Sequence, residues 1–129
     1  MLNRRWRAGQ LSSLLCALRR IASSAAVMIY PVDHPLLQKR TLEELVKEFR
    51  ARKAGQQIVM PRHKGVYGHP IILSAVLRKE LFHAKTAREV VYRVPERIRV
   101  FEAHTAAIHE DFDTEESYGK CLRKFRAWA

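Results

Sequence analysis

The sequence lacks any apolar run of the roughly 18 residues that a membrane-spanning helix needs. Glycine and proline are also sparse, with five of each in 129 residues, and 47% of the chain is hydrophobic. Such a composition excludes a disordered, collagen-like or low-complexity protein. We therefore expect a single globular domain that is cytoplasmic and has no membrane partner.

Cysteine is scarce, and no zinc-binding pattern is present. Cys16 and Cys121 are far apart and belong to no C-x-x-C pair, and the six histidines show no H-x-x-x-H or comparable spacing. The sequence also shows no arrangement of Ser, His and Asp, or of Cys and His, that would indicate a hydrolase. We expect two buried, reduced thiols, as in a cytosolic protein, rather than a disulfide.

Acidic residues are missing from residues 1–32, which hold five arginines, and the whole chain carries a net charge of +11. This start also fits an organellar transit peptide, although its periodic apolar face favours a segment of the fold. The later basic residues are dispersed and lack the aromatic interleaving of a nucleic-acid groove. Nucleic acid is therefore an unlikely partner, and some cations are assigned to a polyphosphate ligand.

Helical and extended patterns alternate along the chain. They predict helices over about 11–23, from Thr41 to near Gly55, over 87–94 and over about 115–127, strands over 25–30, 57–61 and 97–103, and a segment over 71–82 that begins extended and turns helical. This order indicates an α/β fold, a three-layer α/β/α sandwich with a mostly parallel sheet. Such sheets bind ligands at the carboxyl ends of their strands.

Asp33 follows the first predicted strand, between Pro31 and Pro35. Each proline fixes its own backbone and restricts the residue before it, so the carboxylate points in a narrow range of directions. A rigid carboxylate at a strand end suits Mg²⁺, which takes one or two protein carboxylates plus substrate phosphates. The alternative is that Asp33 only caps a turn.

Asp111 and Asp113 form a second candidate metal site. Two carboxylates at i and i+2 in an extended segment point the same way, whereas Phe112 points into the core. The alternative is that Asp113 or Thr114 serves as the N-cap of the last helix.

A glycine-containing loop at residues 65–70 is the third candidate. Gly68 would let the backbone approach a ligand, and the basic residues at 62–64 suit a phosphate. His69 beside Pro70 has the alternative role of a hydrogen-bonding loop residue.

Four stretches, in order, resemble one family: GQLSSLLCALRRIASSAAVMIYPVDHPLL, IVMPRHKGVYGHPIILSAVL, TAREVV and HEDFDTEESY. They are similar to the MobA-like NTP transferases, in particular the molybdenum cofactor cytidylyltransferases. The resemblance runs from about Trp6 to Phe125. It implies a Rossmann-like nucleotidyltransferase fold.

The resemblance also implies an activity and a set of site residues. The reaction would be transfer of CMP or GMP from CTP or GTP to the phosphate of molybdopterin, with release of pyrophosphate. Asp33 would be catalytic and would hold Mg²⁺. The implied roles are metal ligands Asp33, Asp111 and Asp113, nucleotide-binding residues Gly9, Ser12 and Ser13, and acceptor-binding residues Gly68, His69 and Pro70.

Two departures from the family pattern qualify this expectation. Glu115 replaces a proline, and the glycine-rich L-A-A-G-x-S-x-R-M-G loop that cradles NTP phosphates is not in the sequence. We therefore expect residues 1–129 to be one partial domain, N-terminally truncated, marginally stable and poorly active. The alternatives are an inactive or regulatory remnant, a basic nucleic-acid-binding module, and one half of a site that a partner chain completes.

Overall fold

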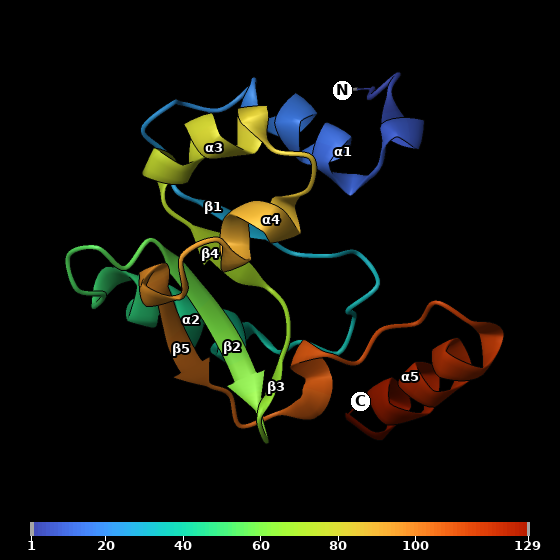
Figure 1. Ribbon diagram of the computed structural model, residues 1–129. Helices are drawn as coiled ribbons and strands as arrows, with labels where there is room; N and C mark the ends of the chain where they lie inside the picture. The colour runs from blue at the N-terminus through green and yellow to red at the C-terminus, as the bar shows by residue number, and fades with distance from the viewer. Residues whose placement is uncertain (1, 129) are drawn as a thin grey trace.

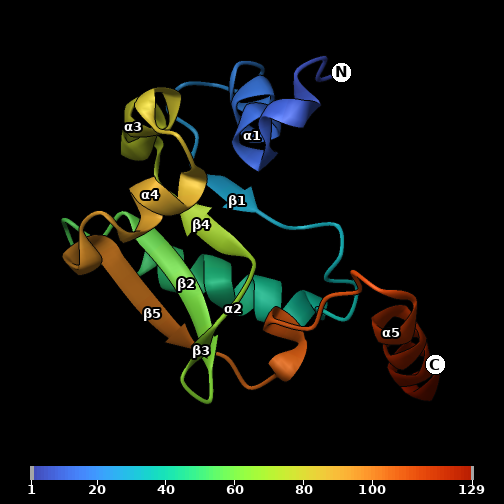
Figure 2. The ribbon, with the colours of Figure 1, turned by 45° about the vertical axis from the view of Figure 1, so that its right-hand side comes forward.

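The computed structural model of the chain describes residues 2–128, which form a mixed sheet covered by helices on both faces (Figure 1, Figure 2). The strands are β1 (Val27–Ile29), β2 (Ile58–His63), β3 (Val66–Tyr67), β4 (Ile71–Leu73) and β5 (Ile98–Glu102). The α-helices are α1 (Gln10–Leu18), α2 (Lys39–Arg50), α3 (Arg78–His83), α4 (Ala87–Tyr92) and α5 (Glu115–Trp128). Short 3₁₀ turns span Trp6–Ala8, Ala75–Leu77, Pro95–Arg97 and Ala106–Ile108.

The sheet is mixed rather than mostly parallel, which corrects that part of the prediction. β4 lies between β1 and β2 and is antiparallel to both, β3 is antiparallel to β2, and β5 is parallel to β2. The three strands expected from the sequence, β1, β2 and β5, do run in one direction. The antiparallel strands arise because the chain leaves β2 through a tight hairpin, and a hairpin reverses the strand direction.

Two apolar clusters on opposite faces of the sheet confirm the three-layer architecture. Ile58 and Met60 of β2 face one layer, made of α1, α3 and α4, whereas Val59 between them faces α2. This alternation follows from the two-residue period of a strand. Burial on both faces explains why the strand sequences show no polar alternation.

The acid-free N-terminal segment is part of the fold. Leu18 at the end of α1 is 1% exposed and packs in the cluster on β2 and β4. α1 ends five residues earlier than predicted, and Arg78 donates hydrogen bonds to the carbonyls of Leu18 and Ala22 there. The guanidinium thus satisfies backbone acceptors that a helix end leaves free.

The capping prediction is confirmed for α4 and wrong for α2. Thr86 accepts a hydrogen bond from the backbone N–H of Glu89 at 3.1 Å, as a capping residue does. α2 instead begins at Lys39, two residues before Thr41. The Thr41 side chain is buried, and its backbone N–H donates to the Gln38 carbonyl at 3.0 Å.

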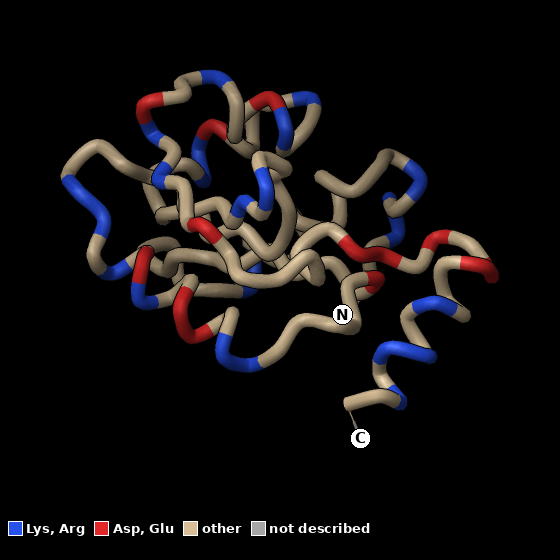
Figure 3. The backbone as a smooth tube through the Cα atoms, turned by 90° about the horizontal axis from the view of Figure 1, so that it is seen from below, with Lys and Arg blue, Asp and Glu red and all other residues tan. Residues whose placement is uncertain are grey.

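α5 begins and ends close to the predicted positions. Thr114 accepts a hydrogen bond from the Ser117 N–H at 3.1 Å and so caps the helix start, as one of the two alternatives proposed. Figure 3 shows acidic residues leading into α5 and basic residues along its later turns, which complements the helix dipole. The buried Cys121 joins α5 to a small cluster with Leu36.

Both cysteines are free; Cys121 is buried and Cys16 half-buried. In residues 2–128, no helix has the length and apolarity to cross a bilayer.

We expect Arg78→Ala to lower the free energy of unfolding by about 2 kcal/mol, because it removes charged hydrogen bonds to two backbone carbonyls. Urea denaturation measures this change. The matched control is Lys79→Ala, at the exposed neighbouring position. An equal loss of stability in both variants would contradict the capping role of Arg78.

Candidate functional site

Asp33 lies in the loop that follows β1, with one carboxylate oxygen left free. Its Oδ1 is buried and accepts no hydrogen bond from any residue in the described part of the chain. The nearest cationic candidate is Nε2 of His34, at 3.9 Å, which is beyond hydrogen-bond distance. A buried acceptor without a partner is costly, so this oxygen is suited to a cation or a donor from a ligand.

His34 is a site residue that the sequence reasoning missed. Its side chain is buried, and Nδ1 has no hydrogen-bond partner within residues 2–128. The imidazole lies 5.6 Å, centroid to centroid, from that of His69. The available signal was its position, directly after Asp33 and before a second proline.

His69 is half-buried, and burial lowers the pKa of its imidazole, with a smaller contribution in the same direction from His34. The negative charge of Asp33 opposes this shift. The neutral form of His69 is therefore favoured.

The turn at residues 68–70 packs closely against the 3₁₀ turn that ends at Ile108. The Gly68 N–H donates to Pro61 O at 3.0 Å and the His69 N–H donates to Ile108 O at 2.7 Å. A Cβ on Gly68 would lie 2.2 Å from the Ile108 carbonyl oxygen, so no other residue fits without a backbone shift. Pro70, which follows, is buried.

Asp111 and Asp113 lie on a segment that contacts the Asp33 loop through the backbone. The Phe112 N–H donates to Asp33 O at 3.2 Å, and the Phe112 ring packs with Leu36 and Cys121 as the alternation predicts. Both aspartate residues are exposed. Among residues 2–128, no three metal-ligating side chains are gathered into one group.

The free oxygen of Asp33 nevertheless fits a magnesium ligand. Mg²⁺ keeps several waters and takes substrate phosphate oxygens, so a single protein carboxylate is enough to anchor it. Asp33 would hold the metal, with the segment of Asp111 and Asp113 next to its loop.

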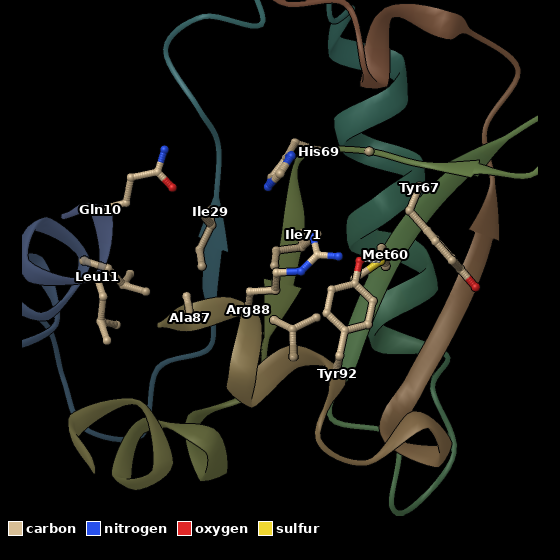
Figure 4. Close-up of a pocket in the computed structure, with 13 residues that line it drawn as sticks. Gln10, Leu11, Ile29, Met60, Tyr67, His69, Ile71, Ala87, Arg88 and Tyr92 are labelled. Atoms are coloured by element: carbon tan, nitrogen blue, oxygen red, sulfur yellow. Dashed lines mark hydrogen bonds between the residues drawn. The ribbon is translucent and has the colours of Figure 1, made fainter. Parts of the chain in front are cut away.

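A pocket of about 370 Å³ lies beside His69, between α1, α4 and the sheet (Figure 4). Its floor is apolar, and Gly68 and His69 border it. Arg88 extends from α4 with its guanidinium 4.9 Å from the centre of the Tyr92 ring. Of the described residues that line the pocket, Arg88 alone has a permanent charge. This combination suits a ligand with an apolar body and one anionic group.

Gly9, Ser12 and Ser13 lie at the start of α1, where the two hydroxyls are engaged locally. Ser12 Oγ donates to Gly9 O at 2.7 Å, and the Asn3 amide donates to both Ser12 and Ser13 at 2.9 Å. α1 reaches the pocket of Figure 4 through Gln10 and its apolar neighbours instead.

The chain has a nucleotidyltransferase-like fold with a carboxylate in the loop that follows the edge strand β1. The profile of one family, described as the MobA-like NTP transferase domain, matches residues 1–104. The chain belongs to this family, as its motifs predict. No curated protein sequence matches it significantly.

Solved structures support the same fold. Rv0371c from Mycobacterium tuberculosis H37Rv superposes with a TM-score of 0.71 at 24% identity, covering 86% of this chain and 57% of that one, and it has also been crystallised with manganese. Its homologue from Mycobacterium sp. strain JC1 gives 0.74 at 20%, covering 91% and 59%. Molybdopterin-guanine dinucleotide biosynthesis protein A from Archaeoglobus fulgidus gives 0.69 at 16%, covering 92% and 64%. The chain thus spans less than two thirds of each of these structures.

The lowered pKa of His69 predicts a pH dependence of stability. The unfolded chain takes up a proton at the ordinary pKa of 6.5, before the folded chain does, so the contribution is present above this value and is lost as the pH falls below it. We expect the His69→Asn variant to lose less stability than the wild type between about pH 7 and about pH 5. Denaturant melts at both pH values measure the difference. His83→Asn, at an exposed position, should behave as the wild type; equal slopes for all three proteins would refute the prediction.

Proposed function

We propose that this chain takes part in Mg²⁺-dependent transfer of CMP or GMP from CTP or GTP to the phosphate of an acceptor such as molybdopterin, with release of pyrophosphate. The observation that carries the proposal is the buried Oδ1 of Asp33, in the loop after β1, which has no hydrogen-bond partner among residues 2–128. Membership of the MobA-like family and the pocket beside His69 support it. A solved relative crystallised with manganese is consistent with a divalent metal.

In this proposal, Asp33 holds Mg²⁺, which would neutralise charge on the nucleotide phosphates and orient them. An oxygen of the acceptor phosphate forms a bond to the α-phosphorus, and the bond from that phosphorus to the bridging oxygen breaks, so pyrophosphate leaves. The chain's own contribution is largely positioning, which is the main source of catalysis in phosphoryl-type transfers.

The acceptor would occupy the pocket between α1 and α4. Arg88 pairs with its phosphate, because a guanidinium offers a fork of donors that matches phosphate oxygens. His69, whose neutral form is favoured, accepts or donates a single hydrogen bond without adding charge. The apolar floor, with Ile71 and Met60, contacts the body of the acceptor.

One observation favours a second candidate, an inactive or regulatory remnant of the fold. Asp111 and Asp113 are exposed and do not join Asp33 in a three-ligand group within the described residues. A remnant would keep the sheet but would not bind nucleotide in a metal-dependent way.

We expect Asp33→Asn to abolish Mg²⁺-dependent binding of CTP or GTP, because the amide has no negative charge to offer the metal. Isothermal titration with Mg²⁺ and with EDTA measures this binding on the full chain. The control is Glu96→Gln, which removes an exposed carboxylate far from Asp33 in the sequence and should leave nucleotide binding unchanged. If the unmodified chain binds CTP or GTP without metal, or does not bind them at all, the remnant is favoured over the transferase.

We expect Arg88→Gln to weaken acceptor binding by about tenfold or more, the effect of losing charge-assisted hydrogen bonds worth roughly 1.5–3 kcal/mol. Fluorescence titration with molybdopterin measures this affinity. Nucleotide affinity should be unchanged. Lys79→Gln removes an exposed cation from α3 and should alter neither. An unaltered acceptor affinity in Arg88→Gln would remove this residue from the acceptor site.

A further inference from the structure

A second pocket, of about 460 Å³, lies on the other flank of α1. Residues of the N-terminal segment, one side of α1 and the turn between α3 and α4 form its walls. Leu11 borders both this pocket and the one in Figure 4, so α1 stands between them. We call this second cavity the basic pocket.

The basic pocket concentrates positive charge. Arg4, Arg5, Arg19 and Lys85 line it, they come from three separate segments, and its described lining includes no acidic residue. None of the four forms an ion pair within residues 2–128. The carboxylate nearest in sequence to Lys85, Glu89, accepts the Lys85 backbone N–H and pairs with Arg93 instead.

Hydrogen bonds to the Arg5 backbone join the segment that carries this residue to α1, and Arg19 of the turn after α1 contacts an aromatic ring. The Arg5 N–H donates to Asn3 Oδ1 at 2.9 Å, and the Arg5 carbonyl accepts from Ser12 Oγ at 3.0 Å. Arg19 lies over the Phe82 ring, 5.5 Å from its centre. The backbone that carries Arg5 is thus held against α1, which lowers the ordering cost of binding an anion there.

We propose that the basic pocket binds the oligophosphate group of a small phosphorylated molecule, at a site separate from the Asp33 site. Guanidinium groups match phosphate oxygens and stay charged at any physiological pH. Leu11 and Leu15 add apolar surface for the rest of such a molecule. The described lining includes no aromatic residue on which bases could stack, which favours a small molecule over RNA.

Inorganic tripolyphosphate is the probe, titrated into the full chain by calorimetry without Mg²⁺. We expect one binding event that weakens with salt, and a loss of about tenfold or more in affinity in the double variant Arg5→Gln/Arg19→Gln. The matched control Arg50→Gln/Arg126→Gln removes two exposed arginines from α2 and α5 and should keep most of the affinity. Lys85→Gln, at an exposed position, should weaken binding several-fold and provides a second variant if the double variant does not fold.

Four outcomes would overturn the proposal. Equal loss in the two double variants means that tripolyphosphate responds to net charge alone, and no loss in either pocket variant means that it binds elsewhere on the protein. A requirement for Mg²⁺, or loss of binding in Asp33→Asn, means that the anion occupies the Asp33 site. Tighter binding of a single-stranded RNA that the same pocket variants abolish means that the surface serves nucleic acid. Because the tripolyphosphate titration without Mg²⁺ contains neither metal nor nucleotide, failure of the proposed transferase function leaves its result unchanged.

Discussion

The site depends on the close contact between Gly68 and the carbonyl of Ile108. Here the hairpin that leaves β2 meets the segment that follows β5, and only a residue without a Cβ fits. The His69 N–H bonds to Ile108, and four residues later the Phe112 N–H bonds to the Asp33 loop. Three segments far apart in the sequence are thus joined by backbone hydrogen bonds, so the relative position of Asp33 and His69 is set by the main chain and not by flexible side chains.

Two polar atoms in the loop between Pro31 and Pro35 have no hydrogen-bond partner among the described residues. Asp33 Oδ1 and His34 Nδ1 are buried without partners among the described residues, and each such atom costs about 1–3 kcal/mol. The prolines at 31 and 35 limit the unfolded chain as well as the folded one, which offsets part of that cost. Leu36, which follows Pro35, is 1% exposed and anchors the loop to α5 through Cys121. The loop is held by its neighbours, while its polar groups remain available.

Short-range features, such as single strands and helix caps, can be predicted from the sequence. Features that depend on strand pairing or on tertiary burial cannot. The strands at β1, β2 and β5 were found because buried β-branched residues form short runs, and the α4 cap was found because Thr86 and Glu89 have the right spacing. The sequence predicts β4 only as the extended start of a helical segment, since its antiparallel place between β1 and β2 depends on partners distant in sequence. Thr41 has the same spacing as Thr86, but burial of its side chain removed it from the capping position. The prolines on either side of Asp33 mark its loop in the sequence, whereas the burial of His34 and its proximity to His69 depend on the fold.

Ion pairs determine which parts of the surface keep an unneutralised positive charge. Two arginines in and beside the sheet have carboxylate partners: Arg62 of β2 pairs with Glu102, and Arg97 in the turn before β5 pairs with Glu80 of α3. Residues 1–32 contain no acid, so their arginines have no local partner and depend on the tertiary fold to bring one. The fold brings Lys85 instead, at the turn between α3 and α4, and directs Glu89 toward Arg93. Four cations that form no ion pair within residues 2–128, Arg4, Arg5, Arg19 and Lys85, therefore lie along one flank of α1, while the opposite flank, facing His69 and Arg88, stays largely apolar with one cation. A single short helix thereby separates two cavities of different electrostatic character.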